Sequence, residues 1–168
     1  MKQSYWILLL VFLIVFSART YVAYQSETFT PDAYFELRQV EHIRETGLPL
    51  VKDDLSAGGR SNIVAPVFHY LLAFFTLFFP LFFVGKVIPQ LFAAVAVIFV
   101  YLIALEMTKS EQWALVTAFI SGFLPVFFAF TVNAVSPYTL AIPLMLAAMY
   151  CFLRFEKKLL YVELFLVI

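Results

Sequence analysis

Long apolar runs around a single polar stretch are the feature that most limits how this chain can fold. The runs cover residues 5–24, 87–107, 113–132 and 138–153, and a further run begins near residue 159. A helical membrane span needs about 20 apolar residues, because the hydrocarbon core of a bilayer is about 30 Å thick. Runs of this length without strand-like alternation favour α-helices over a β-barrel. The sequence therefore predicts an all-α, polytopic membrane protein.

The composition supports this class. Hydrophobic residues make up 64% of the 168 residues, charged residues only 13%, and 21 residues are phenylalanine, which is too apolar for an ordinary water-soluble surface. The formal net charge of zero excludes a nucleic-acid partner bound by bulk electrostatics. The sole cysteine, Cys151, lies in an apolar run and cannot form an internal disulfide. We therefore expect the lipid bilayer to be the main partner of the chain.

The two ends of the chain lead to separate expectations. The first run is long, and Phe16 occupies the position where cleavage before Arg19 would require a small residue, so we expect a retained membrane anchor instead of a signal peptide. The last run is still apolar at Ile168. This ending predicts that the native polypeptide is longer, with packing of the last segment against a partner as the alternative.

The orientation in the membrane depends on whether residues 64–84 cross it. If they do not, one side of the membrane collects five basic residues: Lys2, Lys109, Arg154, Lys157 and Lys158. If they do cross, the same side holds only Lys2 and Lys86. Because basic residues gather on the cytoplasmic side, the first arrangement is favoured, with a cytoplasmic N-terminus. As a separate expectation, the membrane is the plasma membrane of a prokaryote.

Residues 64–84 also make a poor straight span. Pro66, His69 and Pro80 interrupt the run, and proline removes a helical hydrogen bond. We therefore expect a re-entrant or juxtamembrane segment. The loop 25–63 and the short turn 133–137 then emerge on the same extracytoplasmic side, where they can share one site.

The polar loop contains a predicted helix. Thr30 and Pro31 form a helix start, and Gly47 followed by Pro49 forms a stop. Apolar side chains recur between them every three residues, at Tyr34, Leu37, Val40 and Ile43. This spacing predicts an amphipathic helix lying on the membrane.

The loop also concentrates acidic residues, with 7 of the 11 carboxylates of the chain between residues 25 and 62. Asp32 lies in the first turn of the predicted helix, where free N–H groups favour an ionised carboxylate. Such a carboxylate can bind a divalent cation or accept a proton from a nucleophile. The alternative is that Asp32 only complements the helix dipole.

Further candidate residues are polar groups close to this loop. Asp53 and Asp54 precede a Gly-Gly turn and are either metal ligands or solvated turn residues. Arg60 lacks the context of a phosphate loop but can meet a lipid-linked phosphate. His69 is either a hydrogen-bonded structural residue or part of a site. Arg19 either extends to the interface or binds an anion, namely a loop carboxylate or a substrate phosphate.

The order of these parts resembles the N-terminal module of the GT-C membrane glycosyltransferases. The resemblance lies in one span followed by residues 31–38 (PDAYFELR), 46–49 (TGLP) and 66–72 (PVFHYLL), and then by two spans joined through a short basic turn. Among these enzymes the chain is most similar to the archaeal relatives of the oligosaccharyltransferase catalytic subunit. The protein O-mannosyltransferases are close behind.

The resemblance implies transfer of a sugar or glycan from a polyprenyl-phosphate or polyprenyl-diphosphate carrier to a protein or glycan acceptor outside the cytoplasm. The acidic residue in the first loop of these enzymes maps onto Asp32, which would be the catalytic or metal-binding carboxylate, with Mg²⁺ or Mn²⁺ as the cation. Arg19 or Arg60 would offset charge on the departing phosphate.

The chain departs from the pattern of the oligosaccharyltransferase type at the second acidic motif. That position reads VNAVSPY over residues 132–138, so Asn133 would supply an uncharged oxygen as ligand. The remaining spans and the soluble C-terminal domain of such enzymes would be further partners. The alternatives are a non-catalytic membrane subunit, a small transporter with a structural acidic loop, or an inactive fragment. Charges inside the spans would favour a transporter, and the apolar runs carry almost none between their ends.

Overall fold

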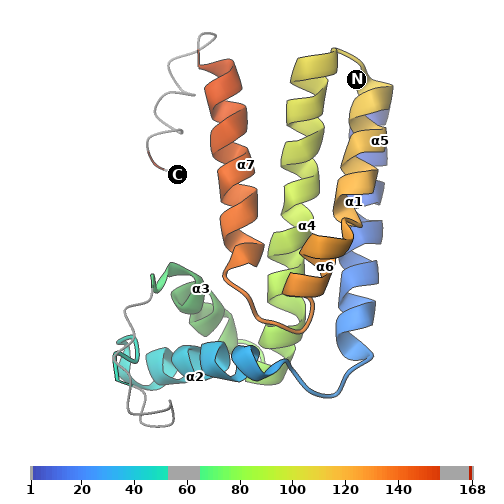
Figure 1. Ribbon diagram of the computed structural model, residues 1–168. Helices are drawn as coiled ribbons and strands as arrows, with labels where there is room; N and C mark the ends of the chain where they lie inside the picture. The colour runs from blue at the N-terminus through green and yellow to red at the C-terminus, as the bar shows by residue number, and fades with distance from the viewer. Residues whose placement is uncertain (1, 53–64, 156–166, 168) are drawn as a thin grey trace.

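The computed structural model describes residues 2–52, 65–155 and 167, and most of these residues are in α-helices (Figure 1). The helices are α1 (Lys2–Tyr24), α2 (Pro31–Thr46), α3 (Val67–Thr76), α4 (Leu81–Thr108), α5 (Glu111–Gly122), α6 (Pro125–Thr131) and α7 (Tyr138–Arg154). The prediction of an all-α fold is therefore confirmed.

Four of the helices form a bundle, and two lie across one end of it. Figure 1 shows α1, α4, α5 and α7 running side by side, with α2 and α3 below them. We call this end the α2 end. The chain descends to it along α1, leaves along α4, returns along α5 and α6, and leaves again along α7. The turn 133–137 therefore lies at the α2 end, close to the polar loop.

The helices of the bundle are apolar enough to indicate membrane association. Gln3–Tyr24 and Leu81–Thr108 are each long and apolar enough to cross a bilayer, and α5 with α6 adds a third candidate if this bent pair is one span. The 28 residues of α4 give a length of about 42 Å at 1.5 Å per residue. The apolar helices α3 and α7 are shorter.

Two predicted boundaries differ from the structure. A break was expected between the segments 64–84 and 87–107, but α4 begins at Leu81, so that Gly85 and Lys86 lie inside it. The predicted span 113–132 is divided by a bend of 42° between α5 and α6. In both places a proline, Pro80 or Pro125, stands at the start of the new helix, where its missing N–H costs nothing. The predicted run from residue 159 lies outside the described residues except for Val167.

Small residues allow the bundle helices to approach closely. Ala114, Ala118 and Gly122 form a buried stripe along α5 at intervals of four residues. A Cβ atom added to Gly122 would lie 2.3 Å from Cγ2 of Val15 on α1. The buried residues of α7 have the same spacing, at Thr139, Pro143, Ala147 and Cys151. Such stripes are typical of helix packing in membranes, where close van der Waals contact replaces the hydrophobic effect.

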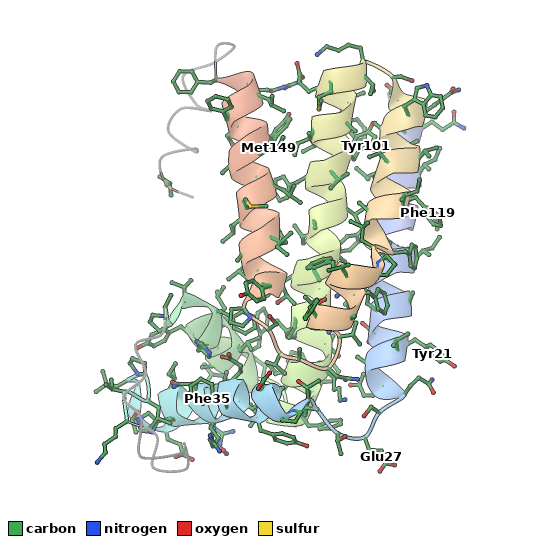
Figure 2. All side chains as sticks on the ribbon, viewed as in Figure 1. Tyr21, Glu27, Phe35, Tyr101, Phe119 and Met149 are labelled. Carbon is green, nitrogen blue, oxygen red and sulfur yellow. The ribbon has the colours of Figure 1, made fainter. Side chains whose placement is uncertain are left out.

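Larger side chains divide between the interior and the outer surface of the bundle. Figure 2 shows Tyr101 among the helices, and only 1% of its surface is exposed. Tyr21 and Phe119 point away from the bundle in the same view, with 67% and 45% exposed. This outward apolar surface is what a bilayer would cover.

A second core at the α2 end determines where the polar loop lies. The apolar face of α2, including Leu37, Val40 and Ile43, packs on Phe68 and Leu72 of α3. Val84 and Ile88 of α4 and Val135 of the turn 133–137 complete this core. The predicted periodicity of α2 is confirmed for Leu37, Val40 and Ile43, and the apolar face that they form is covered by α3, α4 and the turn 133–137. Tyr34 is 47% exposed and stands outside this core.

Candidate functional site

A cleft at the α2 end brings the acidic loop and the turn 133–137 together. It has a volume of about 480 Å³, within the size range of small-molecule sites. Two carboxylates of α2, aromatic side chains of α6 and α7, and the turn form its walls. The lining residues are Asp32, Glu36, Phe130, Ala134, Ser136, Pro137 and Tyr138. The candidate residue Asp32 thus faces the turn that sequence reasoning paired with it.

Backbone contacts fix the position of Asp32 beside this turn. The backbone N–H of Thr30 donates a hydrogen bond of 3.1 Å to the carbonyl oxygen of Asn133. Thr30 is the N-cap residue of α2 and is followed by Pro31 at the first helical position. Asp32 is therefore in the first turn of α2, as predicted, and its side chain is exposed.

The turn itself has an uncommon backbone. Asn133 and Val135 both have positive φ angles, of 62° and 46°. Asparagine tolerates this left-handed region, whereas a β-branched valine at positive φ is strained. Val135 is completely buried in the core at the α2 end. Packing around this side chain therefore holds the turn in shape at the edge of the cleft.

Glu36 is a cleft residue that the sequence analysis did not identify. It lies four residues after Asp32, on the same face of α2. His69 of α3 is 1% exposed, and its Nε2 atom forms a hydrogen bond with Oε2 of Glu36. His69 does not line the cleft and acts as the buried partner of a cleft carboxylate. The spacing of four residues between Asp32 and Glu36 was the feature of the sequence that could have identified Glu36 as a cleft residue.

Lys86 is the second functional candidate that the sequence analysis missed, because it was expected in an interhelical turn. Its side chain is completely buried. Its ammonium group donates hydrogen bonds to the carbonyl oxygens of Ala23, Ser26 and Thr28 and to Oδ1 of Asn133. The predicted ligand oxygen of Asn133 is thus already bound to a cation from within the protein.

Arg19 is buried and does not extend to the interface. Only 1% of its surface is exposed, and its guanidinium lies 4.9 Å and 4.8 Å from the ring centroids of Phe127 and Phe128. Nε donates to Gln90 and Nη2 donates to Thr131, whereas Nη1 is buried without a hydrogen-bond partner among the described residues. No carboxylate is among these contacts. Two basic side chains, Arg19 and Lys86, are therefore buried in helices that were expected to be almost free of internal charge.

An apolar groove continues from the cleft along the side of the bundle. Its volume is about 510 Å³, and it lies between α6 and α7, beside the bend that separates α6 from α5. Its lining residues are Leu124, Val126, Phe127, Phe130, Thr131, Tyr138 and Ile142. Phe130 and Tyr138 line both the groove and the cleft. The acidic cleft and the apolar groove are therefore neighbouring parts of one surface feature.

The remaining predicted ligands cannot be placed. Asp53, Asp54 and Arg60 lie outside the described residues. Within residues 2–52, 65–155 and 167, no group of three or more His, Cys, Asp or Glu side chains is arranged to hold a metal ion. Asp32 and Glu36 are the carboxylates of the described cleft that can contribute to binding a cation.

Comparisons of the chain with protein-family models, with curated proteins and with solved structures give no match. The resemblance to the GT-C glycosyltransferases therefore stays a prediction. Any functional assignment depends on the residues and the geometry of the chain itself.

Proposed function

We propose that the chain is the N-terminal module of a polytopic membrane glycosyltransferase of the GT-C type. It would transfer a sugar or glycan from a polyprenyl-phosphate-type carrier to an extracytoplasmic acceptor. The observation that carries this proposal is the shared wall of Phe130 and Tyr138 between an acidic cleft and an apolar groove. A lipid-linked sugar has the same two parts, with a polar head for the cleft and an apolar chain for the groove.

The two cleft carboxylates support chemistry at the sugar. In the proposed reaction the acceptor oxygen or nitrogen attacks the anomeric carbon, and its proton passes to Asp32. The bond from that carbon to the phosphate oxygen breaks, and the phosphate leaves with the electron pair. The hydrogen bond to His69 fixes Glu36, which orients the acceptor group. Bound Mg²⁺ or Mn²⁺ would neutralise phosphate charge, and Asp32 with Glu36 would hold it.

In this proposal Arg19 does not contact the phosphate directly but acts on it through its electrostatic potential. Its side chain lies behind Phe127 and Thr131, which line the groove. A buried guanidinium in surroundings of low dielectric constant produces a positive potential over several ångströms. That potential would stabilise the phosphate next to the groove. Arg60 stays the candidate for a direct contact.

One observation favours the alternative of a non-catalytic subunit with a structural acidic loop. Lys86 binds the loop through the carbonyl groups of Ser26 and Thr28 and binds the end of α1 through that of Ala23, which is the kind of contact an architectural loop would have. The transporter alternative gains less support, because neither Arg19 nor Lys86 lines the cleft or the groove. Both alternatives predict that no sugar is transferred.

Transfer activity with and without the cleft carboxylate tests the proposal. Membranes with the full-length protein would be supplied with polyprenyl-phosphate and polyprenyl-diphosphate donors labelled in the sugar. We expect the Asp32→Asn variant to lose activity about 100-fold or more, because a positioned proton acceptor contributes about 10² to 10⁴ to the rate. Glu27→Gln is the matched control, since Glu27 is an exposed acid of the same loop outside the cleft.

Three results would contradict the proposal. Undiminished transfer by the Asp32→Asn variant would remove the catalytic assignment. Absence of transfer by the wild-type protein from every donor would favour the non-catalytic alternatives. A large loss in the Glu27→Gln control would show that loop charge in general, and not the cleft, governs the rate.

A further inference from the structure

We propose that four protein oxygens at the α2 end form a cage for a monovalent cation, and that Lys86 fills this cage with a tethered ammonium group. The cage consists of the carbonyl oxygens of Ala23, Ser26 and Thr28 and of Oδ1 of Asn133. In this role Lys86 is a positioning residue that fixes the acidic loop to the turn 133–137. The inference depends on these contacts alone and holds for any reaction in the cleft.

The distances are those of a fully coordinated cation. Nζ of Lys86 lies 2.9 Å from the oxygens of Ala23 and Ser26, 3.0 Å from that of Thr28 and 2.7 Å from Oδ1 of Asn133. An ammonium group has three N–H donors, so four oxygens at these distances satisfy all of them. The ring of Phe29 lies 4.4 Å away and adds a cation–π contact.

The oxygens of the cage need a positive partner. Ala23 is in the last turn of α1, where carbonyl groups have no intrahelical partner and the helix dipole is negative. The three carbonyl groups and the amide oxygen are all neutral. Such neutral oxygens replace the hydration shell of monovalent cations in ion-selective proteins. The cage therefore fits an ammonium group by charge, by number of contacts and by distance.

The cage joins three stretches of the chain that are distant in sequence: residues 23–28, Lys86 and Asn133. Lys86 is on α4, Ala23 is at the end of α1, and Ser26 and Thr28 are in the polar loop. Asn133 belongs to the turn, and its carbonyl oxygen accepts the hydrogen bond from the N–H of Thr30. Asp32 follows two residues after this contact. One side chain thus determines where the first turn of α2 lies relative to the opposite wall of the cleft.

Truncation of Lys86 would open the cage to solutes. Thr28 is exposed and Ser26 is partly exposed, so the space left by the side chain would communicate with water. A free ammonium ion would then occupy the position of Nζ. A choline ion is too large for a site with oxygens at 2.7 to 3.0 Å.

Hydrogen exchange at the N–H of Thr30 tests the proposal without a substrate. The purified full chain would be compared with the Lys86→Ala variant in ammonium chloride and in choline chloride. We expect the truncation to lower the protection of this amide about tenfold or more. Ammonium should restore most of that protection, and choline should not. Lys109→Ala is the matched control, because Lys109 is an exposed lysine in an ion pair with Glu106 at the other end of α4.

Two further variants keep the proposal falsifiable if Lys86→Ala does not fold. Lys86→Met fills the cage without a charge, and we expect lost protection that ammonium cannot restore. Asn133→Asp gives the ammonium a carboxylate partner, and we expect a higher melting temperature than for the wild type. Wild-type protection in Lys86→Met, equal effects of ammonium and choline on Lys86→Ala, or a lower melting temperature of Asn133→Asp would each overturn the proposal.

Discussion

The two buried basic residues, Lys86 and Arg19, differ in how completely the protein satisfies their hydrogen-bond donors. Each N–H donor of Lys86 has an oxygen available, whereas Nη1 of Arg19 has no hydrogen-bond partner among the described residues. A buried charge is expensive unless it is fully hydrogen-bonded or paired. Lys86 should therefore stabilise the fold, whereas Arg19 should cost stability. A residue that costs stability at such a position is a candidate for function.

Replacement of each cation by methionine separates these two cases. We expect Lys86→Met to lower the free energy of unfolding by about 1 to 3 kcal/mol, because buried oxygens lose their donors. Arg19→Met should leave the stability unchanged or raise it, because it removes a charge without a complete set of partners. Thermal unfolding of both variants in detergent would measure the difference. An equal or larger loss for Arg19→Met would contradict this account of Arg19.

Sequence reasoning reached some of these residues and missed others for a physical reason. Asp32 could be placed because Thr30 and Pro31 determine a helix start through local backbone chemistry. The pair of Glu36 and His69 joins residues 33 positions apart, and no local pattern records which side chains meet across two helices. Lys86 was assigned to a turn because a single charge in an apolar run resembles a boundary.

At the scale of elements, the prolines and small residues determine the helices more than total hydropathy does. Gly47, with φ of 75°, ends α2 as the sequence predicts. Hydropathy predicted a break between residues 84 and 87, but α4 begins directly after Pro80. It also predicted one span over residues 113–132, but α6 begins at Pro125 within that span. A hydropathy window averages over such a break and cannot detect it. In the sequence, the only sign of the contact between α1 and α5 at Gly122 is the spacing of small residues, Ala114, Ala118 and Gly122, at intervals of four.

The contact between Gly122 and Val15 gives a prediction for this pair of helices. We expect Gly122→Ala to destabilise the protein by about 1 to 3 kcal/mol, because the new methyl group would overlap the side chain of Val15. Adding Val15→Ala should recover part of this loss, and a double-mutant cycle of thermal unfolding would measure the coupling. Additive losses would show that the two helices do not meet as described. Thr117→Ala, on the exposed face of α5, is the control.

At the scale of the whole molecule, the two ends of the bundle have different chemistry. The α2 end holds the acidic cleft and the cage around Lys86. At the other end, Glu106 forms ion pairs with Lys109 at 2.6 Å and with Arg154 at 3.0 Å, so one carboxylate joins the ends of α4 and α7. Lys109 and Arg154 are two of the basic residues from which the orientation was predicted.

Accessibility of single cysteines from the two sides of the membrane tests the orientation. The native Cys151 is buried and would be replaced by alanine in the background protein. We expect Glu27→Cys to react with an impermeant thiol reagent added outside intact cells, and Lys109→Cys to react only after the membrane is opened. Both native side chains at these positions are exposed. Reaction of both cysteines from the same side would contradict the arrangement in which α3 does not cross the bilayer.

The bend between α5 and α6 has a consequence for how a ligand would arrive. Val126 and Phe130 are each 70% exposed on the outer side of the groove, so in a bilayer the groove would open sideways among the acyl chains. A ligand attached to a lipid chain could then enter the groove by lateral diffusion within the bilayer, without first dissolving in water. Occupancy would follow its mole fraction among the surrounding lipids, and abundant phospholipids would compete for the same entrance.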